Sequence, residues 1–288
     1  MSSKMKLLHT LLILGRISNL PTVWSNILCA WFLCEQIISR DLFFIALIIS
    51  LVYIGGMYLN DYLDADFDEI HCSERPIPSG KINKLMVLVL GLLWMVGAIL
   101  ITMILFEHTS VTWLALLVAM VCIYNWIHKK TPLAILAMGG CRFLIYPMTA
   151  SIFSAEVSVK IFWAGLGMFL YIVGLSGVAR SSNAQPVLKI VSVGFILVSI
   201  TLVFLTADLQ ISGMSIISLV ALLLGAGYFL FVTRPISVGT IVEGLLAGII
   251  LLDFLKVSWS VGIEITFGSI FIGLFLLSLL AQRKIPAN

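Results

Sequence analysis

Acidic side chains concentrate in one short stretch of the sequence. Six of the fourteen acidic residues fall between positions 61 and 74, and the core of this cluster runs from Asn60 to Asp68. If this run is helical, Asn60, Asp64 and Asp68 share one helix face, and Asp61 joins it three residues before Asp64. Carboxylates at a helix C-terminus oppose the helix dipole, so they need a counter-ion. Oxygen ligands along one face suit Mg²⁺, which takes one or two carboxylates and completes its shell with water and substrate phosphate. The alternative is a solvated acidic loop that Arg75 and Lys81 balance.

The acidic run follows an apolar stretch, and the whole chain is unusually apolar. Of its 288 residues, 61% are hydrophobic and 11% are charged, whereas soluble domains carry roughly a quarter charged residues. This composition excludes a disordered chain, a disulfide scaffold and a soluble enzyme. The net charge of +3 is too small to indicate a nucleic-acid partner. We therefore expect one integral membrane domain over residues 1–288.

Apolar stretches of about 18 to 25 residues are typical of transmembrane helices, because a helix satisfies its own backbone hydrogen bonds in lipid. Ten stretches qualify, at 17–38, 41–62, 83–106, 110–127, 132–153, 159–179, 187–206, 213–232, 237–257 and 263–281. The boundaries around the seventh and ninth stretches can be drawn differently. The sequence therefore predicts an all-α, polytopic transmembrane bundle of nine to ten spans.

The distribution of basic residues predicts the orientation of this bundle. With the N-terminus inside the cell, thirteen lysines and arginines fall on the inner side and three on the outer side. This positive-inside bias favours ten spans in the cell (inner) membrane, with both termini in the cytoplasm. The acidic run then lies where the second span reaches the cytoplasm. Its position and its periodicity favour a metal–diphosphate site over a solvated loop.

Other ionisable residues lie inside spans or at their ends. Arg142 is in the middle third of the fifth span, where a lone guanidinium is costly and usually faces a partner or a water-filled cavity. A pairing with a carboxylate such as Glu243 and a contact with substrate are both open. We expect Asp253 to reach the outer interface, and we expect loop solvation to account for His71 and His128.

Three motifs resemble those of the UbiA superfamily of intramembrane prenyltransferases. The run Asn60-Asp61-x-x-Asp64-x-x-x-Asp68, followed by the segment Arg75 to Gly80, resembles the first aspartate-rich motif of this family. Arg16-x-x-Asn19-x-Pro21 resembles its opening helix. Tyr124-Asn125, with the segment Lys129 to Pro132, resembles the end of its fourth helix. Members of the family transfer a polyprenyl group from its diphosphate to an aromatic or other acceptor, using Mg²⁺ in a helical bundle open to lipid.

The resemblance implies a role for each matching residue. Metal ligands to Mg²⁺ on the diphosphate would be Asn60, Asp61, Asp64 and Asp68. Contacts to phosphate oxygens would come from Arg75 and Lys129, and substrate-binding positions would include Asn19, Tyr124 and Arg142. The chemistry agrees, because Mg²⁺, lysine and arginine stabilise the charge that develops on a departing diphosphate. The allylic carbocation needs a dry, aromatic-lined pocket.

The sequence departs from the family at the end of the sixth span. Catalytic members carry a second aspartate motif there, whereas this chain has no carboxylate between Glu156 and Asp208. Hydrogen-bond donors stand in its place, namely Arg180, Ser181, Ser182, Asn183 and Lys189. They either bind the diphosphate directly, with Arg180 as a bidentate contact, or form an ordinary positive-inside loop. This pattern, with the segment Met138 to Arg142, resembles a UbiA-like subgroup encoded in ebo-type bacterial gene clusters.

These observations predict a Mg²⁺-assisted prenyltransferase with its polar site at the cytoplasmic face. Its expected partners are a polyprenyl diphosphate, a lipophilic or aromatic acceptor and the lipid bilayer. The alternative is a non-catalytic UbiA-like protein that binds an isoprenoid or helps to export a lipophilic precursor. The missing second motif favours the alternative. The retained first motif favours the enzyme, because a scaffold has no evident use for carboxylates that oppose a helix dipole.

Overall fold

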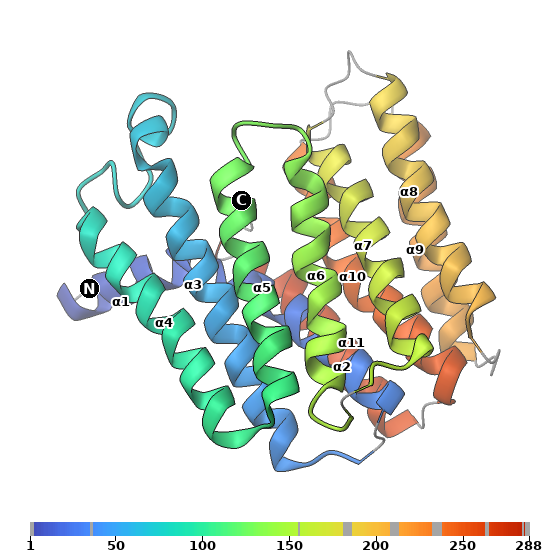
Figure 1. Cartoon of the computed structure of the whole chain (residues 1–288). Coiled ribbons are helices and arrows are strands. Elements are labelled where there is room, and N and C mark those ends of the chain that lie inside the picture. Colours follow the sequence, from blue (N-terminus) through green and yellow to red (C-terminus); the bar gives the residue numbers. More distant parts are fainter. Residues whose placement is uncertain are drawn as a thin grey trace.

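The computed structural model describes residues 3–34, 37–154, 156–180, 186–207, 213–231, 238–262, 265–283 and 285, and these form an all-helical bundle (Figure 1). Its elements are α1 (Ser3–Leu14), the 3₁₀ helix η1 (Ile17–Asn19), α2 (Leu20–Cys34), α3 (Arg40–His71), α4 (Lys84–Leu105), α5 (His108–Ile127), α6 (Ala134–Ala150), α7 (Val159–Arg180), α8 (Pro186–Leu205), α9 (Gly213–Phe231), α10 (Val238–Val261) and α11 (Ile265–Gln282). The predicted all-α class is confirmed.

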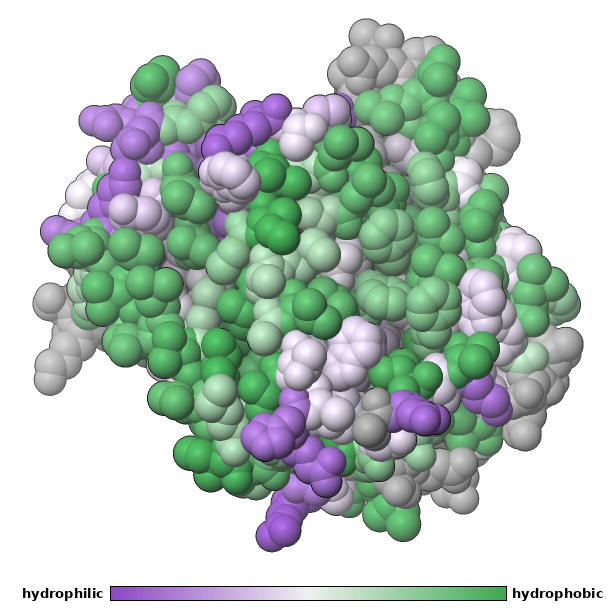
Figure 2. All heavy atoms as spheres, in the orientation of Figure 1, coloured by the Kyte–Doolittle hydropathy of each residue, from purple (hydrophilic) through white to green (hydrophobic). Residues whose placement is uncertain are grey.

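The helices α2 to α11 correspond one by one to the ten apolar stretches of the sequence. Helix α1 is additional, because the first stretch was expected to begin at residue 17. In the described part of the chain, five helices are long and apolar enough by themselves to cross a membrane, namely α3, α4, α5, α7 and the Val187–Leu205 part of α8. Figure 2 shows a broad apolar belt across one face of the molecule, with hydrophilic residues above it at the left and below it.

Close packing between neighbouring helices fixes the position of α3. A Cβ atom on Gly55 of α3 would lie 2.8 Å from the backbone oxygen of Gly91 in α4, and one on Gly91 would lie 3.1 Å from the oxygen of Gly55. Only glycine permits this approach of two backbones. On the adjacent side, the Asn125 side chain of α5 donates to the backbone oxygen of Gly56 at 3.1 Å. Helix α3 is therefore held between α4 and α5.

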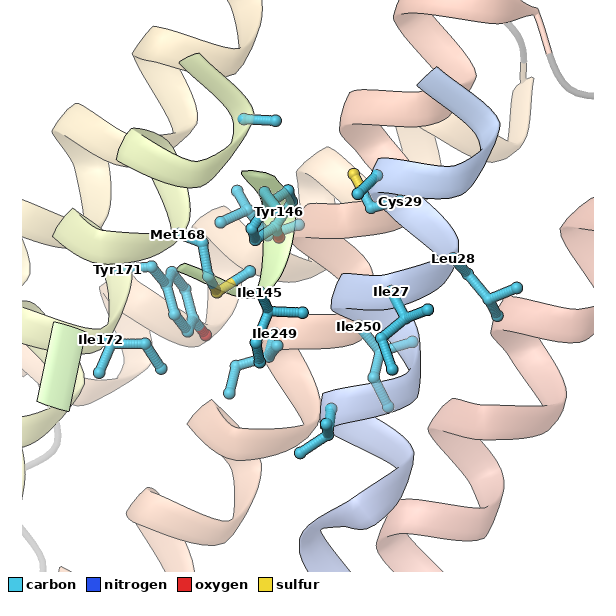
Figure 3. Close-up of a cluster of buried hydrophobic side chains, with 14 of the residues drawn as sticks. Ile27, Leu28, Cys29, Ile145, Tyr146, Met168, Tyr171, Ile172, Ile249 and Ile250 are labelled. Atoms are coloured by element: carbon cyan, nitrogen blue, oxygen red, sulfur yellow. The ribbon is translucent and has the colours of Figure 1, made fainter. Parts of the chain in front are cut away.

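A large apolar core forms where α2, α6, α7 and α10 meet. Figure 3 shows Ile145 of α6, Met168 and Tyr171 of α7 and Ile249 of α10 grouped together, with Ile27 of α2 facing them. All of these side chains are buried. Because these apolar and aromatic side chains are buried and in contact with one another, the four helices form a closely packed unit.

The direction of each helix places the predicted site residues at one end of the bundle. Helices α3, α5 and α7 all end at the top of Figure 1, while the α4–α5 and α6–α7 connections lie at the bottom. Hydrophilic side chains gather at the upper left of the same view (Figure 2). The acidic run of α3 and the basic residues after α5 therefore share one end of the molecule.

Candidate functional site

The acidic run is helical, and its two faces differ. Helix α3 continues without a break to His71, so Asn60, Asp64 and Asp68 do lie on one face. These three residues are 4%, 6% and 3% exposed, whereas the side chain of Asp66 between them is 87% exposed. A solvated acidic loop would leave all of them in water. The structure therefore contradicts the loop interpretation for this face of α3.

Basic residues from outside α3 pair with the buried carboxylates. The Arg75 guanidinium donates to Asp68 at 2.8 Å, and the Lys129 ammonium lies 3.0 Å from Asp64 and 3.8 Å from Asp68. Lys129 also lies 3.7 Å above the ring of Phe67, a cation–π contact that holds its side chain over the helix end. Partial burial acts to lower the pKa of Arg75, but the hydrogen bond and charge of Asp68 outweigh it and raise this pKa.

A third cation, Arg16, approaches the same face from the segment between α1 and η1. Its Nη2 atom lies 3.3 Å from Asn60 Oδ1 and 3.4 Å from Asp61 Oδ1. Its backbone φ of 42° is in the left-handed region, which is uncommon for residues other than glycine. The Tyr53 hydroxyl donates to its carbonyl oxygen at 3.3 Å. This strained turn directs Arg16 toward α3, a role that its motif alone did not indicate.

His128 also belongs to the site, so the expectation of loop solvation is wrong for it. Its side chain is 13% exposed, and its Nε2 atom lies 2.9 Å from Asp64 Oδ1. Its Nδ1 atom lies 2.9 Å from the carbonyl oxygen of Asn125. Its Nε2 atom also lies 3.4 Å from the Asn60 side-chain nitrogen, so His128 contacts two of the predicted metal ligands. The signal in the sequence was its place beside Lys129, at the end of a predicted span.

The charges at this end of α3 are balanced within the protein. Three carboxylates, Asp61, Asp64 and Asp68, face three permanent cations, Arg16, Arg75 and Lys129. The donor set, an amide oxygen and carboxylates, is the type that Mg²⁺ prefers. Within the described residues, no three acidic, histidine or cysteine side chains converge closely enough to share a metal. The face therefore suits an ion that takes one or two protein carboxylates and completes its shell from water and phosphate, which is the usual Mg²⁺ arrangement.

A cavity of about 320 Å³ opens beside this site, between α3, α5, α6, α7 and α10. Its walls are largely apolar. Four of the residues predicted to bind or act on substrate line it, namely Asn19, Tyr124, Arg142 and Arg180, and so does Arg16. The cavity therefore joins residues from helices that are far apart in the sequence, and Arg16 links it directly to the acidic face of α3.

The three predicted residues at the end of α7 and after it differ in their placement. Arg180 is exposed at the end of α7 and donates to the carbonyl oxygen of Pro132 at 3.2 Å. Lys189 is on the first turn of α8 and is not among the residues that line the cavity. Asn183, with the two serines before it, lies outside the described residues.

Arg142 and Asp253 take part in a second polar cluster, deep in the bundle. Arg142 donates to Asn26 at 2.9 Å and to Thr22 at 3.0 Å, so among the described contacts its partners are side chains of α2 rather than Glu243. Asp253 is 2% exposed and accepts hydrogen bonds from Ser25, Asn26 and Tyr146. The expectation that it reaches the interface is wrong, because donors on α2 and α6 satisfy it inside the protein.

Comparison with known proteins gives a family match and a curated relative. Residues 18–234 match the UbiA prenyltransferase family. A segment of 57 residues is 40% identical to the digeranylgeranylglyceryl phosphate synthase of Korarchaeum cryptofilum (strain OPF8), and it spans 20% of each protein.

Solved structures share the architecture over nearly the whole chain. One, from work on digeranylgeranylglyceryl phosphate synthase in membranes, has a TM-score of 0.59 at 15% identity and covers 97% of this chain and 99% of that one. A UbiA homolog from Archaeoglobus fulgidus bound to DMAPP and Mg²⁺ has a TM-score of 0.52 at 14% identity, with 94% and 98% covered. The apo UbiA homolog from Aeropyrum pernix K1 has a TM-score of 0.53 at 14% identity, with the same coverage. This integral, multi-pass membrane protein thus belongs to the UbiA prenyltransferase family, a class of transferases.

Proposed function

We propose that this protein transfers a prenyl group from its diphosphate to a lipophilic or aromatic acceptor held in the cavity beside α3. The observation that carries the proposal is the buried carboxylate face of α3, which meets cations from other segments at the edge of a largely apolar cavity. Charged groups at one side suit the diphosphate, and the apolar walls suit a carbocation that water would destroy.

Asn60, Asp61, Asp64 and Asp68 are the residues proposed to hold Mg²⁺ with the diphosphate. When bound, the ion would neutralise charge on the departing diphosphate. The Archaeoglobus fulgidus homolog, which was solved with DMAPP and Mg²⁺, supports this choice of ion. Arg16 holds Asn60 and Asp61 through long contacts of 3.3 and 3.4 Å, so these two residues exchange partners more readily than Asp68, which Arg75 holds at 2.8 Å.

Basic residues at the same end are proposed to bind phosphate oxygens directly. Arg75 and Lys129 already lie beside the carboxylates. Arg180 donates to a neutral carbonyl and lines the cavity, so a bond to an ionised phosphate oxygen would be stronger than its present bond. Arg180 would then compensate for the missing second aspartate motif. Asn183 and Lys189, which follow it in the chain, are proposed as further substrate-binding residues.

The site end of the bundle is proposed to face the cytoplasm. Arg75 and Lys129 lie in connections on that side of a ten-span bundle, and Arg180 and Lys189 lie at helix ends beside another, in line with the positive-inside bias. A reporter enzyme fused to the C-terminus tests this placement, because it should be active on the cytoplasmic side. Activity confined to the outer side contradicts the proposed orientation.

The function itself is tested on the purified protein in nanodiscs. DMAPP and GPP should bind only when Mg²⁺ is present, and EDTA should abolish binding. With a panel of phenolic and lipophilic acceptors, diphosphate should be released in step with prenylated product. Binding without release in any combination supports the non-catalytic alternative, and the absence of Mg²⁺-dependent binding contradicts the proposed metal–diphosphate site.

A further inference from the structure

Three arginines line the cavity, and the surroundings of Arg142 differ from those of Arg16 and Arg180. Arg16 is paired with Asp61, and Arg180 lies at the exposed end of α7. Arg142 lies eight residues beyond the start of α6, which is about 12 Å along the helix axis. No carboxylate oxygen of the described residues lies within 4.0 Å of its guanidinium. A cation at this depth in a membrane-spanning bundle is costly unless other groups compensate its charge.

A chain of hydrogen bonds connects Arg142 to a buried carboxylate. Arg142 donates to the Asn26 side-chain oxygen at 2.9 Å, and the Asn26 side-chain nitrogen donates to Asp253 at 2.8 Å. A guanidinium only donates and a carboxylate only accepts, so Asn26 satisfies both in a single orientation of its amide. Asp253 thereby fixes Asn26, and Asn26 fixes Arg142.

Asp253 is itself immobilised and does not reach the cavity. Ser25 donates to it at 2.6 Å, and the Tyr146 hydroxyl donates to its other oxygen. Neither Asp253 nor any other acidic residue is among the described residues that line the cavity. The charged side chains of the cavity wall are three arginines, Arg16, Arg142 and Arg180, so the cavity favours a negatively charged occupant.

We propose that Arg142 binds an oxyanion, a carboxylate or phosphate group, on the acceptor, and that Asp253 positions Arg142 through Asn26. This inference rests on the proposed function, because it assigns the acceptor to the same cavity. Contacts to Thr22 and Asn26 use two of the five guanidinium N–H donors within the described chain. The planar fork matches an oxyanion in two-point contact, and its depth separates the acceptor from the diphosphate at the bundle end.

The test compares two small probes on the protein in nanodiscs, without any prenyl donor. The probes are 4-hydroxyphenylacetate and its uncharged amide, and calorimetry gives the ratio of their affinities. The parent should prefer the carboxylate about ten- to a hundredfold. Arg142→Gln should reduce the preference to about twofold or less, and Arg142→Lys should retain part of it, because the charge remains without the fork.

Two further variants separate positioning from stability. Asn26→Leu breaks the link to Asp253 and should also reduce the preference. Lys256→Gln is the matched control, because Lys256 is a buried cation on α10 that donates to Thr206, away from the cavity, so the preference should be unchanged. A merely structural role for the cluster would lower thermal stability without changing the ratio of affinities.

Each result bears on one claim. An unchanged ratio in Arg142→Gln, or no preference in the parent, overturns the oxyanion site. An unchanged ratio in Asn26→Leu overturns the positioning by Asp253. Mg²⁺-dependent DMAPP binding is measured on the same samples. A parent that prefers the carboxylate but does not bind DMAPP contradicts the proposed function alone, whereas one that binds DMAPP without that preference contradicts this inference alone.

Discussion

The two polar regions of this membrane protein satisfy their carboxylates in opposite ways. At the end of α3, charged partners surround Asp61, Asp64 and Asp68, and several of these cations are partly exposed. In the middle of the bundle, three neutral donors satisfy Asp253, and the nearest arginine contacts it only through Asn26.

This difference indicates which region can exchange partners. The cations at the bundle end are partly exposed, so water can solvate them when a metal or a phosphate replaces their contacts with the carboxylates. Short hydrogen bonds in a dry interior leave unsatisfied groups when they break, so the Asp253 cluster is fixed. The end of α3 is thus suited to chemistry, and the Asp253 cluster is suited to holding a binding group in place.

The largest effect is expected from Asp253→Ala. This change leaves three donors without an acceptor and Arg142 without its indirect counter-ion, and should lower the free energy of unfolding by about 3 kcal/mol. Denaturation in detergent, followed by tryptophan fluorescence, measures the loss. Asp66→Ala is the matched control, because that carboxylate is exposed and should cost less than about 1 kcal/mol. Equal losses in the two variants would remove the contrast between the regions.

Asp64→Asn should affect binding far more than stability. Mg²⁺-dependent DMAPP affinity should fall about a hundredfold, because an amide oxygen is a much weaker metal ligand than a carboxylate. Lys129 keeps Asp68 as a partner, and the asparagine oxygen can still accept hydrogen bonds from Lys129 and His128, so the free energy of unfolding should fall by only about 1 kcal/mol, less than in Asp253→Ala. Calorimetry with and without EDTA measures the affinity. A folded variant that binds DMAPP as tightly as the parent contradicts the metal assignment.

Arg180→Ala tests whether a single cation compensates for the missing second motif. DMAPP affinity should fall about ten- to a hundredfold, the value of a charge-assisted contact. Stability should stay constant, since the residue is exposed at a helix end. Arg180→Lys should recover part of the affinity because a point charge replaces the bidentate fork. Unchanged affinity in Arg180→Ala removes this residue from the diphosphate site.

Lys84→Gln should have the smallest effect and marks the outer limit of the site. It breaks the ion pair with Asp66, whose carboxylate faces water on the opposite side of α3. Exposed pairs contribute about 0 to 1 kcal/mol, so both stability and DMAPP affinity should match the parent. A tenfold loss of affinity would show that the diphosphate site extends around the whole end of α3.

The helices could be predicted because lipid constrains them. Ten apolar stretches matched α2 to α11. The four-residue spacing of Asn60, Asp64 and Asp68 predicted that they share one helix face. Both signals are local in the sequence. The added helix α1 was missed because its 12 residues are too few for the window of about 18 to 25 residues that identifies a span.

The partners of these residues could not be predicted because they come from distant segments. Arg16 meets Asp61 across 45 positions, and His128 meets Asp64 across 64. Ser25 and Asp253 are 228 positions apart. A lone carboxylate near a span end resembles an interfacial residue until the opposite helix is known, so the burial of Asp253 depends on packing that no single stretch encodes.

The size of the cavity has a consequence for chain-length selection. Its volume of about 320 Å³ is at the lower end of the range for small-molecule sites, roughly 300 to 1,000 Å³. A diphosphate, an acceptor and the first isoprene unit would fill such a volume, so a longer tail would extend between the helices into the acyl chains. Lipid would surround such a tail both before and after binding, so each additional isoprene unit would change the binding free energy little. The protein would then discriminate poorly among long donors, and the donors present in the membrane would decide which tail is transferred.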